Sequence, residues 1–146
     1  MSYRNGEGYP DPTAGQALGN IARDERRERK REKENQRRND MTRKKVYVAS
    51  KYAGDIKANT EAAVRCCRYV TERGAIPVAS HLMYAASGVL RDHIPGEREM
   101  GLSFGLALIG VCDELWSFGE ISPGMKQEIR EAKRAGIPVR YLEVPR

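Results

Sequence analysis

From Lys45 onward, short runs of β-branched and aromatic residues alternate with segments whose apolar positions recur every three or four residues. The first pattern is typical of strands and the second of amphipathic helices. We predict helices at residues 57–73, at about 97–110, and after the turn in 122–136. The predicted strands are "KVYVAS", "AIPVAS", "CDELWSF" and "IPVRYLEV", which start at Lys45, Ala75, Cys112 and Ile137.

This alternation predicts an α/β domain of the Rossmann-like, flavodoxin-like kind, with three layers and a parallel sheet of four to five strands. Between the second strand and the second helix, residues 81–99 ("HLMYAASGVLRDHIPGERE") show no clear period, and we expect a long loop with a short helical piece. Ligands of such sheets bind at the carboxyl ends of the strands. The loops that matter are therefore Ser50–Asp55, Ser80–Tyr84 and Gly119–Gly124.

The first 44 residues differ from the predicted domain of residues 45–146. Residues 1–20 are rich in Gly, Pro and small polar residues, so we predict disorder there. Residues 21–40 favour a helix but have no apolar face after Ile21 and Ala22. The segment Arg23–Lys45 holds twelve Lys/Arg and six Asp/Glu, whereas the rest of the chain holds fourteen of each sign. This basic tail is either a weak nucleic-acid contact or a solvated helix that links to the domain.

Composition narrows the function classes. No run reaches the roughly 18 apolar residues of a membrane span, and the start of the chain has no apolar signal-peptide core, so we expect a cytoplasmic protein with no membrane contact. Cys66, Cys67 and Cys112 have neither metal nor redox spacing, so we expect reduced, mostly buried thiols. His81 and His93 are not at metal spacing. The chain has no GxxxxGK[ST] motif, no GxGxxG after its first strand and no GxSxG, and we predict neither cofactor nor metal.

Two of the loops carry chemistry that suits an anion. Ser50, Lys51 and Gly54 combine a hydroxyl, a cation and a flexible backbone near a helix start, which suits a phosphate, although an ordinary turn explains them equally well. Ser122 and Gly124 flank a proline at the start of the last helix, where unpaired N–H groups and the positive end of the helix dipole attract anions. Simple capping of that helix is the alternative.

Three single residues have either a structural or a functional role. His81 follows the second strand and is either a structural histidine or a ligand contact, and Asp113 at a strand start either contacts a ligand or caps a neighbouring backbone. Glu128 is the least expected of the three. In the last helix, it falls on the same arc as the apolar residues, whereas the other polar positions project to the opposite side. That apolar arc consists of Met125, Ile129, Ala132 and Ala135.

The order "VYVAS–KYAGD", "IPVASHL", "CDELWSFG" and "SPGMKQEI…AKRAGIPV" resembles the nucleoside 2-deoxyribosyltransferase superfamily, including its 2′-deoxynucleoside 5′-monophosphate N-glycosidases. It is more similar still to a phage and bacterial subgroup of that fold. The resemblance spans about Lys45 to Val144, and its most specific part is the S-x-G-x-x-x-E turn and helix. It implies that Glu128 attacks C1′ of the sugar and forms a glycosyl-enzyme intermediate.

Other site residues follow from the same resemblance. It implies that Tyr47 lies by the sugar, that the "SKYAG" loop with Gly54 binds phosphate, and that Ser122 holds a 5′-phosphate. A serine at this last position, in place of the aspartate of nucleoside-specific transferases, favours a phosphorylated ligand. The complete predicted substrate-binding set is Ser50, Lys51, Tyr52, Gly54, Asp55, His81, Asp113, Ser122 and Gly124.

One position departs from the family. The resemblance places the acid that protonates the leaving base eight residues before Asp113, and that residue here is Gly105. Asp92, Glu97 or Glu99 could replace it, and Glu99 is the preferred catalytic candidate with Glu128 and Tyr47 because it heads the same helix. One hypothesis is therefore an enzyme that cleaves or transfers the N-glycosidic bond of a (deoxy)nucleotide. The alternative is a non-catalytic, phage-encoded module that binds or sequesters a nucleotide signal.

The resemblance also bears on assembly. Relatives complete their sites from a neighbouring subunit, so we expect a homo-oligomer. The segment "MYAASGVL", residues 83–90, is our candidate for that contact. The expected small-molecule partner is a nucleotide or nucleoside.

Overall fold

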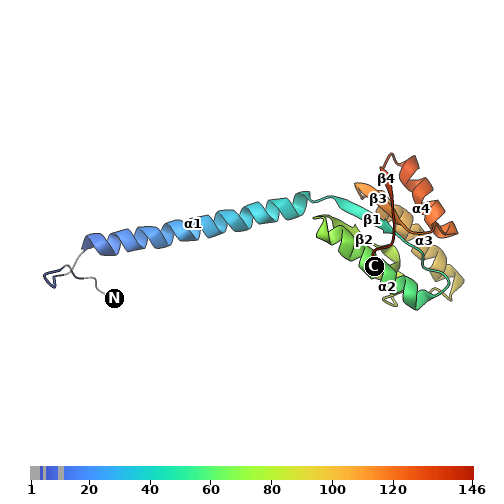
Figure 1. Ribbon diagram of the computed structural model, residues 1–146, viewed down its shortest axis with the longest axis horizontal. Coiled ribbons are helices and arrows are strands. Elements are labelled where there is room, and N and C mark those ends of the chain that lie inside the picture. The colour runs from blue at the N-terminus through green and yellow to red at the C-terminus, as the bar shows by residue number, and fades with distance from the viewer. Residues whose placement is uncertain (1–3, 5, 10–11) are drawn as a thin grey trace. The chain divides into compact units, whose positions relative to one another are not determined.

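A computed structural model describes residues 4, 6–9 and 12–146, and it divides after Thr42 into two compact units. The first unit contains the long helix α1 (Pro12–Thr42), which has no buried residue (Figure 1). The prediction of disorder up to residue 20 was wrong for residues 12–20. Proline at the first helical position is preorganised for a helix, and the alanines, glutamine and leucine that follow favour it. Of the other residues predicted to be disordered, 1–3, 5, 10 and 11 lie outside the described residues.

The second unit, from Arg43 to Arg146, confirms the predicted α/β class. Its four strands form one sheet in the order β2-β1-β3-β4, and all neighbouring strands are parallel. The strands are β1 (Lys45–Ala49), β2 (Ile76–Val78), β3 (Glu114–Phe118) and β4 (Val139–Leu142). The helices are α2 (Ile56–Glu72), a five-residue π-helix η1 (His81–Ala85), α3 (Pro95–Ile109) and α4 (Pro123–Arg134).

The side chains of the strands alternate between two hydrophobic clusters, one on each face of the sheet. Val46 and Val48 of β1 join Cys66 and Val70 of α2 on one face. Tyr47 and Ala49 join residues of α3 and α4 on the other, which include Ile109, Met125, Ile129 and Ala132. The sheet therefore lies between α2 on one side and α3 with α4 on the other, as the three-layer prediction requires.

The order of the strands sets the place of the site. The chain runs from β1 to β2 on one side and then returns to place β3 on the other side of β1. Such a reversal leaves a crevice beyond the carboxyl ends of the two central strands, where open α/β sheets bind ligands. Here those strands are β1 and β3, which end at Ala49 and Phe118.

The segment predicted as a loop with a short helical piece contains η1 directly after β2, and α3 starts at Pro95, two residues earlier than expected. Proline fits the first turn of a helix, because the N–H that it lacks has no partner there. Within the described residues, no helix is both long and apolar enough to cross a membrane.

Candidate active site

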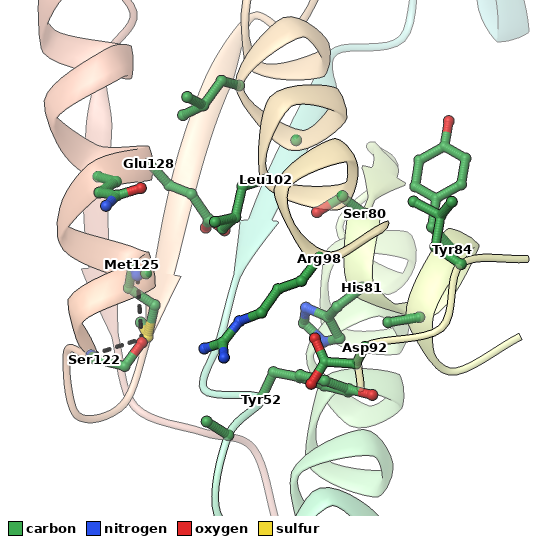
Figure 2. Close-up of a pocket in the computed structure, with 18 of the residues that line it drawn as sticks. Tyr52, Ser80, His81, Tyr84, Asp92, Arg98, Leu102, Ser122, Met125 and Glu128 are labelled. Atoms are coloured by element: carbon green, nitrogen blue, oxygen red, sulfur yellow. Dashed lines mark hydrogen bonds between the residues drawn. The ribbon is translucent and has the colours of Figure 1, made fainter. Parts of the chain in front are cut away.

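A pocket of about 260 Å³ opens at the carboxyl end of the sheet, between the loop after β1, η1, α3 and the start of α4 (Figure 2). Its apolar wall includes Leu90, Leu102 and Leu106. The polar and charged residues that line it are Ser50, Tyr52, Ser80, His81, Tyr84, Asp92, Glu97, Arg98, Ser122, Gln127 and Glu128. This mixture of an apolar wall with a few convergent polar groups is typical of small-molecule sites.

Glu128 is the most unusual of these residues. It lies one turn beyond the start of α4, beside the buried Met125 and Ile129, and its side chain points into the pocket (Figure 2). Its Oε2 atom is buried and has no hydrogen-bond partner among the described residues. Burial disfavours the charged form and raises the pKa of this carboxyl to about 8, although the neighbouring Tyr47 hydroxyl lowers it in part. At pH 7 the carboxyl is therefore mostly protonated.

Tyr47 and Ser80 form a buried hydrogen-bonded pair next to Glu128. The phenol oxygen of Tyr47, on β1, lies 2.8 Å from Oγ of Ser80, which follows β2. Tyr47 is 1 % exposed, and burial followed by the charge of Glu128 raises the pKa of its phenol, which therefore stays protonated. Because either hydroxyl can donate in this bond, its direction can reverse when the protonation of Glu128 changes.

Gly105 fits closely against this pair. A Cβ atom at position 105 would lie 2.9 Å from the phenol oxygen of Tyr47 and 3.1 Å from Oγ of Ser80. Gly105 is buried in α3 and lines the pocket. The position that the family resemblance reserves for an acid is thus occupied by backbone packed against two hydroxyl groups, with no space for a side chain unless they move.

The start of α4 is capped by Ser122. Its Oγ accepts a hydrogen bond from the backbone N–H of Met125 at 3.3 Å, so the capping interpretation of this serine is confirmed. Ser122 and Gly124 also line the pocket, so the positive end of the α4 dipole faces the pocket. Their role in phosphate binding stays a prediction.

His81 lies on the opposite wall with Tyr52. Their ring centroids are 5.6 Å apart with planes tilted by 35°, and His81 Nε2 is 3.4 Å from Oγ of Ser50. Burial lowers the pKa of His81 to about 4, so the imidazole is neutral at pH 7. Burial, and next the charge of Asp92, raise the pKa of Tyr52. These side chains offer neutral aromatic faces and hydrogen-bonding atoms.

Arg98 is a pocket residue that sequence reasoning missed. Figure 2 shows its guanidinium reaching between the Ser122 end of the pocket and the His81 wall. None of the ion pairs among the described residues includes Arg98. Helical spacing could have revealed it, because Arg98 precedes Gly105 by seven residues and therefore lies on the same face of α3.

The structure corrects the predictions for Asp113 and Glu99. Asp113 precedes β3 and therefore lies at the amino end of the sheet, where its carboxylate accepts a hydrogen bond of 2.8 Å from the backbone N–H of Lys45. Glu99 is exposed and does not line the pocket, because the face of α3 that turns inward carries Arg98 and Gly105 instead. The two alternatives to Glu99, Asp92 and Glu97, do line it.

The loop after β1 contributes only in part. Ser50 and Tyr52 line the pocket, whereas Lys51, Gly54 and Asp55 do not. Asp55 instead caps α2, where its carboxylate accepts a hydrogen bond of 3.1 Å from the N–H of Ala58. Of the "SKYAG" loop, Ser50, Tyr52 and Ala53 thus line the pocket, and its binding of phosphate stays a prediction. Among the described residues, no cluster of His, Cys, Asp or Glu could hold a metal ion.

Comparison with known proteins identifies the family of the second unit. Residues 44–142 match the family described as Domain of unknown function (DUF7768). The chain belongs to this family. The match covers most of the second unit, including all four strands from β1 to β4 and all the elements that form the pocket. No curated protein matches the chain.

A solved structure resembles the chain: a 2-deoxyribosyltransferase from the psychrotolerant bacterium Bacillus psychrosaccharolyticus, with a TM-score of 0.56 and 14 % sequence identity. The alignment covers 68 % of this chain and 72 % of that one. The domain therefore has a distant 2-deoxyribosyltransferase-like fold, which confirms the resemblance at the level of the fold. The family match does not distinguish the phage and bacterial subgroup.

The fit around Gly105 generates a stability prediction. Gly105→Ala should lower the free energy of unfolding by about 1–3 kcal/mol, because the new methyl group must displace the buried Tyr47–Ser80 pair. Gly101→Ala is the matched control on the same helix. Its Cβ would meet only Leu90 Cδ1, at an ordinary 3.6 Å, and alanine favours a helix over glycine by up to about 1 kcal/mol. Urea unfolding of both variants would measure the difference, and equal tolerance would contradict the close fit.

Proposed function

We propose that this domain cleaves or transfers the N-glycosidic bond of a (deoxy)nucleotide, with Glu128 as the nucleophile. The observation that carries the proposal is the carboxyl of Glu128, which is buried, lacks a partner for one oxygen and lines a pocket at the carboxyl end of the sheet. An enzyme that forms a covalent sugar ester needs a carboxyl that faces the ligand and is shielded from bulk water. Burying such a group without a partner costs stability, so its presence favours a functional role in which a ligand contacts the unpaired oxygen.

The chemistry would follow that of retaining glycosidases. An oxygen of Glu128 attacks C1′ of the sugar and the base departs, and water or an acceptor then releases the sugar from the ester. The carboxylate also stabilises the positive charge that develops at C1′. The fold of the domain and the 2-deoxyribosyltransferase named above support a nucleoside-type substrate.

Two positive features of the pocket favour a phosphorylated ligand. Arg98 extends a guanidinium with no ion-pair partner among the described residues, and the start of α4 presents N–H groups beside Ser122 (Figure 2). A phosphate on the sugar could bind the arginine in a bidentate manner while the helix N-terminus stabilises its charge. The nucleotide assignment and the role of Ser122 in holding phosphate both rest on this arrangement.

A second candidate function is a non-catalytic nucleotide-binding module. The observation that favours it is Gly105, which supplies no proton at the position where the resemblance places the acid. A base that leaves without protonation does so far more slowly, because general acid catalysis typically contributes 10²–10⁴-fold. The same pocket would then retain a nucleotide without turnover.

The predicted partners beyond the small molecule stay predictions. The segment Arg23–Lys45, which would contact nucleic acid, includes every basic residue of α1. The segment 83–90, which would contact another copy of the chain, exposes Met83 and Val89.

The test is a panel of nucleosides and nucleoside 5′-monophosphates incubated with the purified chain, with the released base followed by chromatography. We expect base release from at least one monophosphate and a loss of roughly 10³-fold or more in Glu128→Gln, as for other nucleophile substitutions. Glu120→Gln is the matched control, because Glu120 is exposed and lies outside the pocket. Thermal stabilisation by a nucleotide without base release would favour the binding module, and neither signal would contradict the nucleotide assignment.

The same panel tests the anionic subsite. Arg98→Ala should raise the KM for 5′-monophosphates at least about tenfold and leave that for nucleosides nearly unchanged, since a charge-assisted hydrogen bond contributes about 1.5–3 kcal/mol. Arg130→Ala serves as control, because Arg130 is exposed on α4 and does not line the pocket. An equal effect of Arg98→Ala on nucleosides and monophosphates would show that this cation does not recognise phosphate.

A further inference from the structure

If the proposed function holds, the departing base needs a proton, and the obvious donors of the pocket are poorly suited to supply it. His81 is neutral at pH 7, because burial lowers its pKa to about 4. Glu97 forms an ion pair with Arg91, whose Nε lies 2.9 Å from Glu97 Oε2. Asp92 is exposed and lies beside Tyr52 at the outer part of the pocket (Figure 2). Gly105 has no side chain.

A buried line of hydroxyl groups offers another route. Ser80 lines the pocket, is only 9 % exposed, and shares a hydrogen bond of 2.8 Å with the Tyr47 hydroxyl. Tyr47 in turn interacts with the carboxyl of Glu128. A Cβ atom at position 105 would lie only 2.9 Å from the Tyr47 oxygen and 3.1 Å from that of Ser80, so Gly105 leaves both hydroxyls in place where a larger residue would displace them. The pocket surface is therefore connected to Glu128 through two hydroxyl groups.

We propose that Ser80 donates the proton to the departing base and that this proton is replaced from the Glu128 carboxyl through the Tyr47 hydroxyl. The inference rests on the proposed function and adds a second catalytic residue to it. Tyr47 acts as the relay, because its hydroxyl can accept from Glu128 and donate to Ser80 at the same time. Glu128 then supplies the proton first and the attacking oxygen second.

The step balances in atoms and electrons. The C1′–N bond breaks, its electron pair goes to the base nitrogen, and that nitrogen takes the Ser80 proton. Ser80 takes the proton of Tyr47, and Tyr47 takes that of Glu128. The carboxylate oxygen so formed makes the new bond to C1′. In the second step a water oxygen bonds to C1′, the ester C1′–O bond breaks, and one proton of the water returns along the same hydroxyls to Glu128.

This mechanism has a characteristic pH dependence. The groups around Glu128 that titrate or carry charge are Tyr47 of β1 with Cys112 beside it, and across the pocket Glu97 and Arg98 of α3, Asp92 and His81. Burial raises the pKa of Glu128 to about 8, so its proton is present at neutral pH and is lost above about pH 8. Activity should therefore fall as the pH rises through that value. If Glu128 acted only as a preformed carboxylate, activity would rise instead.

The experiment compares two leaving groups in the full-length chain. One substrate is the nucleoside 5′-monophosphate that the wild type cleaves, and the other is 4-nitrophenyl 2-deoxyribose 5-phosphate, whose phenolate departs without a proton. Ser80→Ala should lower kcat about 10²–10⁴-fold on the nucleotide but less than about tenfold on the nitrophenyl substrate. Ser80→Thr, which keeps the hydroxyl, should recover most of the loss. Ser103→Ala is the matched control, because Ser103 is exposed on α3 outside the pocket.

Each outcome decides a different question. Equal losses on both substrates, or no loss on either, would overturn the role of Ser80 and leave the proposed function intact. A wild-type chain that released neither leaving group would overturn the proposed function and this inference with it. If Ser80→Ala does not fold, the pH profile of the wild type decides, because a rise in activity through about pH 8 would contradict proton donation by Glu128.

Discussion

The site depends on the burial of one carboxyl group. Glu128 lies on the arc of α4 that packs against the sheet, so the packing that holds α4 in place also takes the carboxyl out of water. Burial raises its pKa and leaves Oε2 without a partner among the described residues. An unpaired buried polar group costs stability. A ligand that reaches this oxygen could offset that cost, and this is why the carboxyl, more than the fold, points to a function.

The surroundings of Glu128 are adapted to an uncharged carboxyl. Among the described residues, the polar neighbour that lowers its pKa is the Tyr47 hydroxyl, which is itself kept protonated by burial and is hydrogen-bonded to Ser80. The guanidinium of Arg98 is in none of the ion pairs among the described residues, and Figure 2 shows it reaching between Ser122 and His81. The pocket thus combines a neutral, hydrogen-bonded floor with charged groups, which are the Arg98 guanidinium and the carboxylates of Asp92 and Glu97. In the proposed function, the sugar lies at the neutral floor and its phosphate at the guanidinium.

Local patterns predicted much of this arrangement and missed the parts that depend on tertiary contacts. The periodicity of α4 placed Glu128 on the buried arc, and the alternation of strands and helices predicted the sheet. The pairing of Tyr47 with Ser80 depends on the register of β1 with β2, which pairs Tyr47 with Val78. That register is not readable from either strand alone.

The errors have a physical cause as well. Residues 100–112 contain no charged residue, so the sequence of α3 does not indicate which side of that helix faces the pocket. Glu99 is the preferred candidate in the sequence because it heads the same helix as Gly105, but the pocket-facing side of α3 carries the adjacent Arg98 instead. Asp113 is not a site residue, because it precedes β3 and therefore lies at the edge of the parallel sheet opposite to the ligand site.

The most direct test of this account is the titration of the Glu128 carboxyl by ¹³C NMR in the full-length protein, with the signal assigned by its loss in Glu128→Gln. The account predicts a midpoint near pH 8, because burial without a compensating partner disfavours the charge. A midpoint near the ordinary value of 4.5 would show that the carboxyl is solvated or paired, and would contradict both its protonated state at pH 7 and the proton donation built on it.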